Sequence, residues 1–191
     1  FQRIWRFDRD GRTDLSTETS GTPLPGVTLT PDMIRRTFLG EISVSDIFGS
    51  DATNARFVIA TPILRDGKPV AGLAAEVSAR ALDGVLPPVG LADGWIAAII
   101  DRQGTFVSRS VAPEVWIGRK VRAESIAATQ GNAPAGTYES ATREGVPALN
   151  SYRRSALTGW TTVVAVPREF VVAPMQKSAL LITLVALGAL S

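Results

Sequence analysis

The 191-residue sequence contains no cysteine and no histidine. Without cysteine there can be no disulfide bond and no thiolate nucleophile, an absence that fits either a reducing cytosol or a bacterial periplasm. Without histidine there can be no serine–histidine–aspartate triad, and without both residues the usual zinc sites cannot form. The sequence also has no glycine-rich phosphate-binding motif. We therefore expect no catalytic residues, no metal and no cofactor within this segment.

The charges are nearly balanced. The sequence has 20 basic and 18 acidic residues, which give a formal net charge of +2. Because no basic block or arginine stripe appears, we do not expect a nucleic acid as partner. The acidic residues could supply the carboxylate pair of a glycosidase, but nothing in the sequence brings two of them into one cleft. A periplasmic hydrolase therefore remains a minor alternative.

One turn motif occurs twice. The sequence DRQG at residues 101–104 separates an apolar run at residues 95–100 from a run rich in β-branched and aromatic residues that ends at Ser110. This pattern predicts a β-hairpin, because the aspartate can cap its own turn and the glycine accepts a positive φ. The sequence DRDG at residues 8–11 lies between similar runs, and its glycine precedes that of the first motif by 93 residues. The spacing indicates a domain used twice.

A second pair of hairpins supports this duplication. The turns RDG at residues 65–67 and REG at residues 143–145 each separate two strand-like runs. We expect one module at residues 1–86, a proline-containing linker at 87–93 and a second module at 94–167. Between the hairpins we expect a helix that starts after Thr30, a half-buried strand at 42–48, about two helical turns at 78–86 and a helix at 124–130. Gly72 indicates a bulge or a close backbone approach.

The C-terminal segment is strongly apolar. Residues 178–191 read SALLITLVALGALS and carry no charged side chain. A membrane-spanning helix needs about 20 such residues. A buried terminal helix is the alternative, but such a helix should show a polar face. We interpret residues 168–191 as a juxtamembrane helix and the start of a transmembrane helix. Because the chain opens with Phe1 rather than methionine, we expect it to be an excerpt.

The order of these motifs resembles the double Cache sensor family. The stretches that carry the resemblance are ARFVIATPILRDGKPVAGLAAEVS (55–78), WIAAIIDRQGTFVSRS (95–110), IGRKV (117–121) and AGTYESATREGVPALNSYRRSALTGWTTVVAVP (135–167). The resemblance implies an α+β fold of two tandem PAS-like modules, each an antiparallel sheet flanked by helices, ahead of a membrane helix. The TGW strand followed by Pro167 is similar to sensor histidine kinases of the HWE class from proteobacteria. The long N-terminal helix usual in the family is missing here.

The resemblance also implies a function. We expect the extracytoplasmic ligand-sensing domain of a receptor in the bacterial inner membrane, facing the periplasm, acting as a homodimer and attached to a histidine kinase. The same sensor on a chemoreceptor or a diguanylate cyclase is the alternative, and nothing in these residues distinguishes the outputs. A cytoplasmic PAS module with haem or flavin is disfavoured because the sequence lacks histidine and cysteine. The aromatic and aspartate signature of the amino-acid-binding members is not found, so the ligand stays open.

We expect the small-molecule ligand in the first module, against the sheet formed by residues 42–48, 57–64 and 70–77. The candidate contacts are Arg36, Asp46 and Arg56, because they are polar groups on or near apolar strand faces. The alternative for each is a surface ion pair. We expect four aromatic residues to belong to the core of the second module rather than to a ligand site: Trp116, Tyr138, Tyr152 and Trp160.

Overall fold

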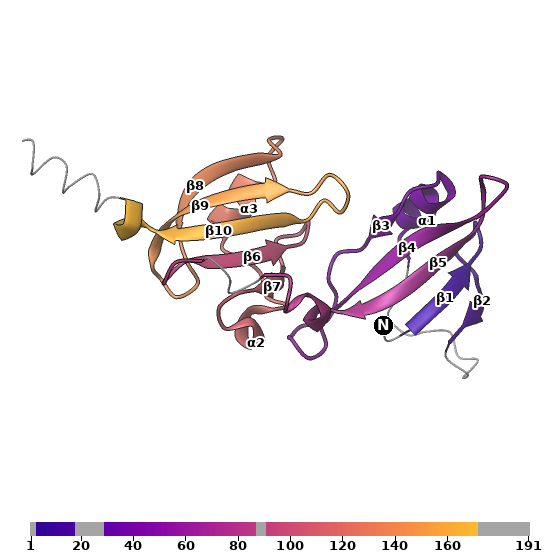
Figure 1. Ribbon diagram of the computed structural model, residues 1–191, viewed down its shortest axis with the longest axis horizontal. Coiled ribbons are helices and arrows are strands. Elements are labelled where there is room, and N and C mark those ends of the chain that lie inside the picture. The colour runs from indigo at the N-terminus through magenta and orange to yellow at the C-terminus, as the bar shows by residue number, and fades with distance from the viewer. Residues whose placement is uncertain (1–2, 18–28, 87–90, 172–191) are drawn as a thin grey trace, which may run out of the picture.

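The computed structural model describes residues 3–17, 29–86 and 91–171 of the chain. Its first module consists of β1 (Arg3–Phe7), β2 (Thr13–Ser16), α1 (Pro31–Phe38), β3 (Ser43–Val44), β4 (Arg56–Arg65), β5 (Lys68–Ser78) and a short 3-10 helix, η1 (Ala79–Leu82) (Figure 1). The strands form one antiparallel sheet in the order β2-β1-β5-β4-β3. Helix α1 covers one face of this sheet, where Met33 packs with the buried side chains of Trp5 and Phe7.

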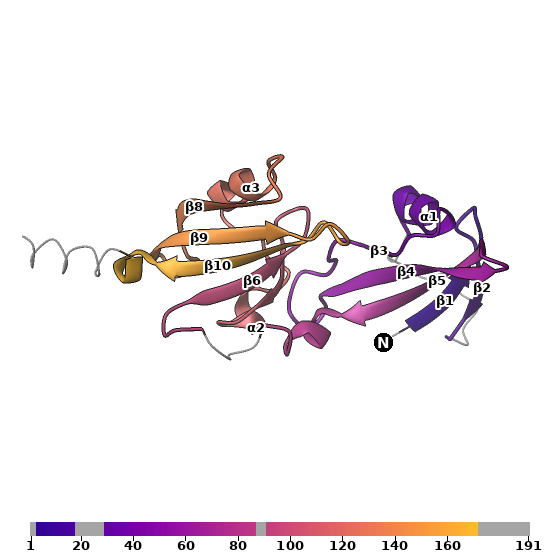
Figure 2. The ribbon, with the colours of Figure 1, turned by 45° about the horizontal axis from the view of Figure 1, so that its top comes forward.

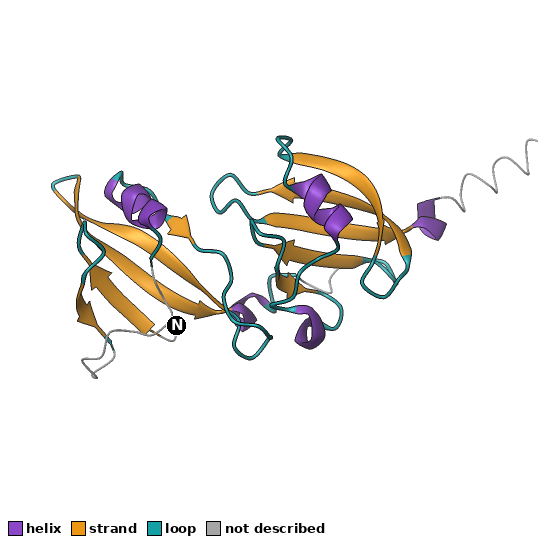
Figure 3. Ribbon diagram, turned by 180° about the vertical axis from the view of Figure 1, so that it is seen from behind, coloured by secondary structure: helices purple, strands orange, loops and turns teal. Residues whose placement is uncertain are grey.

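The second module consists of β6 (Ile96–Ile100), β7 (Phe106–Arg109), α2 (Pro113–Trp116), α3 (Ala123–Thr129), β8 (Ala135–Ala141), β9 (Pro147–Arg154) and β10 (Thr161–Pro167). Its strands form a second antiparallel sheet in the order β7-β6-β10-β9-β8. Helix α3 covers one face of it, as α1 covers a face of the first sheet (Figure 3). The core under this helix contains Ile100, Phe106 and Tyr152.

The two modules have the same topology. When the strands of each module are counted from its own start, both sheets follow the order 2-1-5-4-3. The repeat extends to packing: a Cβ on Gly11 would lie 2.6 Å from Ile34 of α1, and one on Gly104 would lie 2.7 Å from Ile126 of α3. Each DxxG corner is thus held under the helix of its own module. The duplication and the fold of tandem PAS-like modules are confirmed.

The predicted turns and caps form for the expected reasons. The Asp8 carboxylate accepts hydrogen bonds from the backbone N–H groups of Asp10 and Arg12, and Gly11 has a φ of +79°. The hydroxyl of Thr30 caps α1 by accepting the N–H of Met33 at 3.2 Å. Gly72 marks a close approach, since a Cβ there would lie 2.1 Å from the Phe7 ring.

Two predicted elements are shorter than expected. The strand expected at residues 42–48 comprises only Ser43–Val44, because the Ser45 hydroxyl accepts the N–H of Val58 and interrupts the backbone ladder. The chain pairs with β4 again only at Phe48, which forms an isolated bridge with Arg56. The helix expected at residues 78–86 is the single 3-10 turn Ala79–Leu82. Both segments lie where the first module meets the second.

The modules lie end to end, and β10 runs toward the far end of the second module (Figures 1 and 2). Residues 168–171 continue from it as a helix. Within the described residues, no helix is long and apolar enough to cross a membrane. The predicted span at 178–191 lies outside them, as do linker residues 87–90. The limits of the two domains therefore stay a prediction.

Candidate functional site

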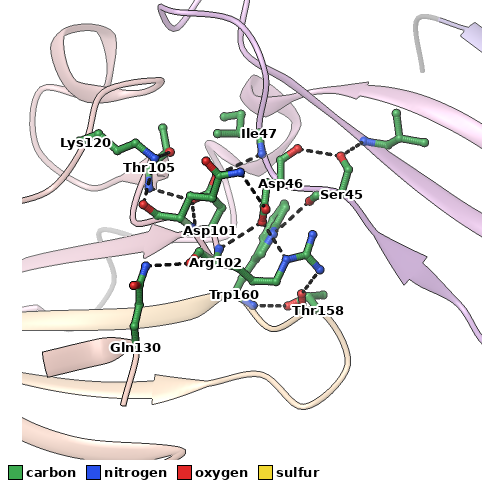
Figure 4. A network of polar contacts seen from close by, with 12 residues as sticks. Ser45, Asp46, Ile47, Asp101, Arg102, Thr105, Lys120, Gln130, Thr158 and Trp160 are labelled. Atoms are coloured by element: carbon green, nitrogen blue, oxygen red, sulfur yellow. Dashed lines mark hydrogen bonds and ion pairs between the residues drawn. The ribbon is translucent and has the colours of Figure 1, made fainter. Parts of the chain in front are cut away.

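The corner of the second module binds the first module directly. The Asp101 carboxylate accepts the N–H groups of Gln103 (2.9 Å) and Thr105 (2.8 Å) within its own turn. It also accepts the N–H of Ile47 from the first module, at 3.2 Å (Figure 4). One carboxylate thus closes the hairpin and attaches it to the neighbouring module. The equivalent Asp8 makes only the turn contacts among the described residues.

An ion pair lies beside this contact. Arg102 Nε donates to Asp46 Oδ1 at 2.9 Å, and the backbone N–H of Arg102 donates to the same oxygen at 3.2 Å. The other end of the guanidinium donates to the carbonyl oxygen of Thr158 (Figure 4). Asp46 therefore connects the segment after β3 to the turn at residues 101–104, and Arg102 extends this contact to Thr158 in a second turn.

The apolar part of the contact is centred on Trp160. Its ring meets Phe57 edge to face, with centroids 5.0 Å apart and planes at 81°. Its indole N–H donates to the carbonyl oxygen of Ser45 at 3.2 Å. A shared core of Val44, Phe57 and Val77 with Val107 and Trp160 surrounds this pair. We call the region formed by residues 44–47 and Phe57 on one side and residues 101–104 and Trp160 on the other the joint. Trp160 thus belongs to the joint rather than to the core of the second module alone.

Burial at the joint affects the ionisation of Asp101. Removal from water raises the pKa of its carboxyl above the usual aspartate range, because burial penalises the charged form. The hydrogen bond from Thr105 acts in the opposite direction, and the nearby Asp46 carboxylate raises the pKa further. The joint therefore holds an acidic group whose charge is energetically costly.

The first module carries a charged cluster on the face that α1 covers. Glu76 is buried at 7% exposure and pairs with Arg56, whose Nε lies 3.0 Å from Oε1. Arg3 lies on the other side, with Nη1 3.8 Å from Oε2. Strand register aligns Arg3, Glu76 and Val58 in one row beside the apolar core row that contains Trp5. This cluster is the polar part of an otherwise apolar sheet face.

The three predicted contact residues lie in three places. Arg36 is on α1 and pairs with Glu41 at 2.9 Å, Asp46 is in the joint, and Arg56 is in the charged cluster. No hydrogen bond or ion pair within the described part of the chain joins any two of them. The sequence analysis missed Glu76. It is the lone acid in the strand AGLAAEVS and lies two residues after the buried Ala74, so the alternation of a strand puts both side chains on the same face.

The second module has a cavity between its sheet and α3. It encloses about 480 Å³ including its opening to solvent. The floor is apolar and formed by β6 and β10, for example by Ala98, Val163 and Ala165. Tyr138 lies on one wall, and burial from water raises the pKa of its hydroxyl. The part of this space that a water-sized group can occupy is only about 50 Å³, so the cavity suits a very small molecule rather than a drug-sized one.

Arginines dominate the polar part of the cavity lining. Arg109 is almost fully buried, and its two terminal nitrogens donate to the two carboxylate oxygens of Glu144 at 2.9 and 2.8 Å. Burial would raise the pKa of Glu144, but the hydrogen bonds from Arg109 and other donors outweigh it and lower the pKa. Arg122 donates through Nε to the carbonyl oxygen of Thr142 at 3.0 Å. Arg143 stacks over the Trp116 ring at 4.6 Å.

No protein-family model matches the sequence, and no curated protein matches it. Solved structures with the same fold do match. The extracellular domain of rpHK1S-Z16, described as a histidine kinase, is 16% identical with a TM-score of 0.56, and the alignment covers 88% of this chain and 71% of that one. The L-Gln-bound ligand-binding domain of the Pseudomonas aeruginosa chemoreceptor PctB is 15% identical with a TM-score of 0.57, over 88% of this chain and 69% of that one.

The periplasmic sensory domain of the Campylobacter jejuni chemoreceptor Tlp1 is 11% identical with a TM-score of 0.51, over 71% of this chain and 54% of that one. These matches show that the chain has the fold of extracytoplasmic sensor domains of receptors.

Proposed function

We propose that this chain is the ligand-sensing region of a receptor in the bacterial inner membrane. It faces the periplasm, is anchored through the apolar segment at residues 178–191 and works as a homodimer. The output is a histidine kinase of the HWE class. Support comes from the sensor-domain fold shared with rpHK1S-Z16 and from the apolar segment that follows the second module.

The ligand site that we propose is the face of the first sheet that carries Arg56. The buried Glu76 offers a negative charge and the flanking arginines offer positive charge, an arrangement suited to a small molecule with both kinds of group. The ligand-binding domains of PctB and Mlp24 were solved with amino acids bound. An amino acid is therefore the first ligand class to test. Arg36 and Asp46 stay in the proposal as predicted contacts.

The observation that carries the proposal is a short structural connection from this site to the exit of the second module. Arg56 and Phe57 are neighbours on β4, so their side chains lie on opposite faces of the sheet. Arg56 belongs to the charged cluster, whereas Phe57 contacts Trp160 in the joint. Trp160 in turn precedes β10, which ends at Pro167 directly before the helix at residues 168–171. A ligand that moves Arg56 would therefore change the packing of Phe57 against Trp160 in the joint and the position of β10. This change would be a shift between existing conformations.

A chemoreceptor or a diguanylate cyclase is the second candidate for the whole protein. Sensor domains of chemoreceptors match this chain as well as those of histidine kinases do, with TM-scores of 0.57 and 0.56. The gene sequence beyond Ser191 distinguishes the outputs. A kinase there supports the proposal, and a methyl-accepting coiled coil or a cyclase domain replaces it with the alternative.

Isothermal titration calorimetry of the chain with the standard L-amino acids tests the site. We expect at least one of them to bind, and Arg56→Ala to weaken it about tenfold or more because a charge-assisted hydrogen bond is lost. Arg12→Ala is the matched control, since Arg12 lies in the exposed first hairpin and is 79% exposed. Unchanged affinity in Arg56→Ala would remove Arg56 from the site.

A further inference from the structure

The cavity of the second module exists because small side chains replace large ones at equivalent positions. The 93-residue offset between the two corners aligns Trp5 with Ala98 and Phe7 with Ile100. Strand pairing agrees, because Trp5 pairs with β5 and Ala98 with β10, which hold the same place in their sheets. Trp5 and Phe7 fill the space under α1, whereas the smaller residues leave the space under α3 open.

The adjacent row of residues in the sheet also differs between the two modules. In the first module this row holds Arg3 and the buried Glu76. Its counterpart in the second module holds Ile96, Ala165 and Asn150, and all three line the cavity. The buried acid of the first module thus has no counterpart here. The two modules therefore offer different chemistry on equivalent faces.

The charge of the cavity is positive. Its lining includes three arginines and, among the described residues, no aspartate or glutamate. Arg109 is neutralised by Glu144, and Arg122 already donates through Nε to a backbone carbonyl. Arg143 differs from both, because its Nε is buried and has no hydrogen-bond partner in the part of the chain that the structure describes. A buried donor without an acceptor is costly unless a ligand or water satisfies it.

We propose that the second-module cavity is a binding site for a small organic carboxylate with a short apolar body. The apolar body lies on the sheet floor at Ala98 and Ala165, and the carboxylate accepts from Arg143. This site is additional to the first-module site of the proposed function and does not depend on it. Because Ala165 and Val163 are on β10, an occupant touches the strand that leads from the joint to the exit of the module.

NMR titration of ¹⁵N-labelled 191-residue chain tests the proposal with isobutyrate and benzoate as probes. We expect saturable shifts of the Ala98 and Ala165 amides. Isobutyramide and benzamide, which keep the apolar bodies but lack the charge, should bind at least about tenfold more weakly. Inorganic phosphate should also bind at least about tenfold more weakly than the carboxylates, because it has no apolar body to place on the sheet floor.

Two variants and one control locate the site. Arg143→Gln should weaken isobutyrate binding about tenfold or more, since it removes a charged donor. Ala98→Leu should also weaken it by filling the floor, and circular dichroism of both variants checks that they fold. Arg153→Gln makes the same charge change at an exposed position of β9 and should leave binding unchanged.

Three results would overturn the proposal. Two of them are equal binding of the amides and unchanged affinity in folded Arg143→Gln. The third is no shift of the Ala98 and Ala165 amides at about 10 mM of either carboxylate, a concentration at which millimolar affinity would be visible. Because an amino acid is also a carboxylate, the variants separate the two proposals: Arg56→Ala reads the first module and Arg143→Gln reads the second. Failure of one proposal is therefore distinguishable from failure of the other.

Discussion

Removal of the ion pair in the joint should weaken the contact between the modules. Arg102 Nε lies 2.9 Å from Asp46 Oδ1, and the side chains are 39% and 22% exposed. The perturbation is a double-mutant cycle of Asp46→Ala, Arg102→Ala and the combined variant. The cycle isolates the energy of this pair from the other effects of each substitution.

The expected magnitude follows from the geometry. Exposed ion pairs contribute about 0.2–1 kcal/mol. Because both side chains are partly buried, we expect this pair in the upper part of that range, at about 0.5–1 kcal/mol, and solvent screening at Arg102 keeps it from exceeding the range. Asp46→Ala should cost more than the pair itself, about 1–2 kcal/mol, because the backbone N–H of Arg102 and the side chain of Gln103 also lose an acceptor.

Urea unfolding at neutral pH, at low and at high salt, provides the assay. The coupling energy should fall as salt increases, because salt screens the pair. The pair between Arg6 and Asp14 in the first hairpin is the control, since both side chains are almost half exposed (46% and 47%) and lie far from the joint. A coupling energy between Asp46 and Arg102 that is zero, or no larger than that of the control pair, would refute the assigned role of Asp46.

Three further perturbations test other parts of the structure. The pKa of Asp101 is raised by burial, so the folded state holds this proton more tightly than the unfolded chain, and the resulting stability is lost as the pH rises. The free energy of unfolding of the wild type relative to Asp101→Asn should therefore fall as the pH rises above about 4, the usual aspartate pKa, and a flat or rising difference in pH-dependent urea unfolding would contradict this. Gly72→Ala should cost about 1–3 kcal/mol because its Cβ would meet the Phe7 ring at 2.1 Å, whereas Gly84→Ala, with no atom near its Cβ, should be nearly neutral in the same assay. Trp160→Phe should cost about 1 kcal/mol through the lost hydrogen bond to Ser45, and Trp160→Ala about 3–5 kcal/mol; equal costs in thermal unfolding would show that the ring contact with Phe57 contributes nothing.

The fold could be predicted from the sequence largely because turn chemistry is local. The aspartates at positions 8 and 101 and the glycines three residues later determine where the chain reverses, and the apolar runs on either side supply the strands. The recurrence of this corner, supported by a second pair of hairpin turns, indicates the duplication. The strand at residues 42–48 was predicted too long because its alternation continues through Asp46, while the contacts that pull this residue away come from the other module.

The sites could be predicted only in part, for a related reason. Arg56 was singled out because it precedes an apolar strand, but its partner Glu76 is 20 residues away in sequence and is brought beside it by strand register. The joint joins residues 46 and 102, and no local pattern encodes that pairing. The cavity follows from a difference in side-chain volume between equivalent positions, which becomes visible only when the two sheets are compared.

The central claim is that ligand binding to the first module changes the conformation of the joint. The indole N–H of Trp160 reports on this change most directly. It donates to Ser45 of the first module, and its NMR resonance can be assigned from its loss in Trp160→Phe. When the amino acid found by calorimetry is titrated into the chain, this resonance and the Ile47 amide should shift with the calorimetric midpoint. A saturating ligand that shifts only residues around Arg56 and leaves Trp160 and Ile47 unchanged would contradict the claim.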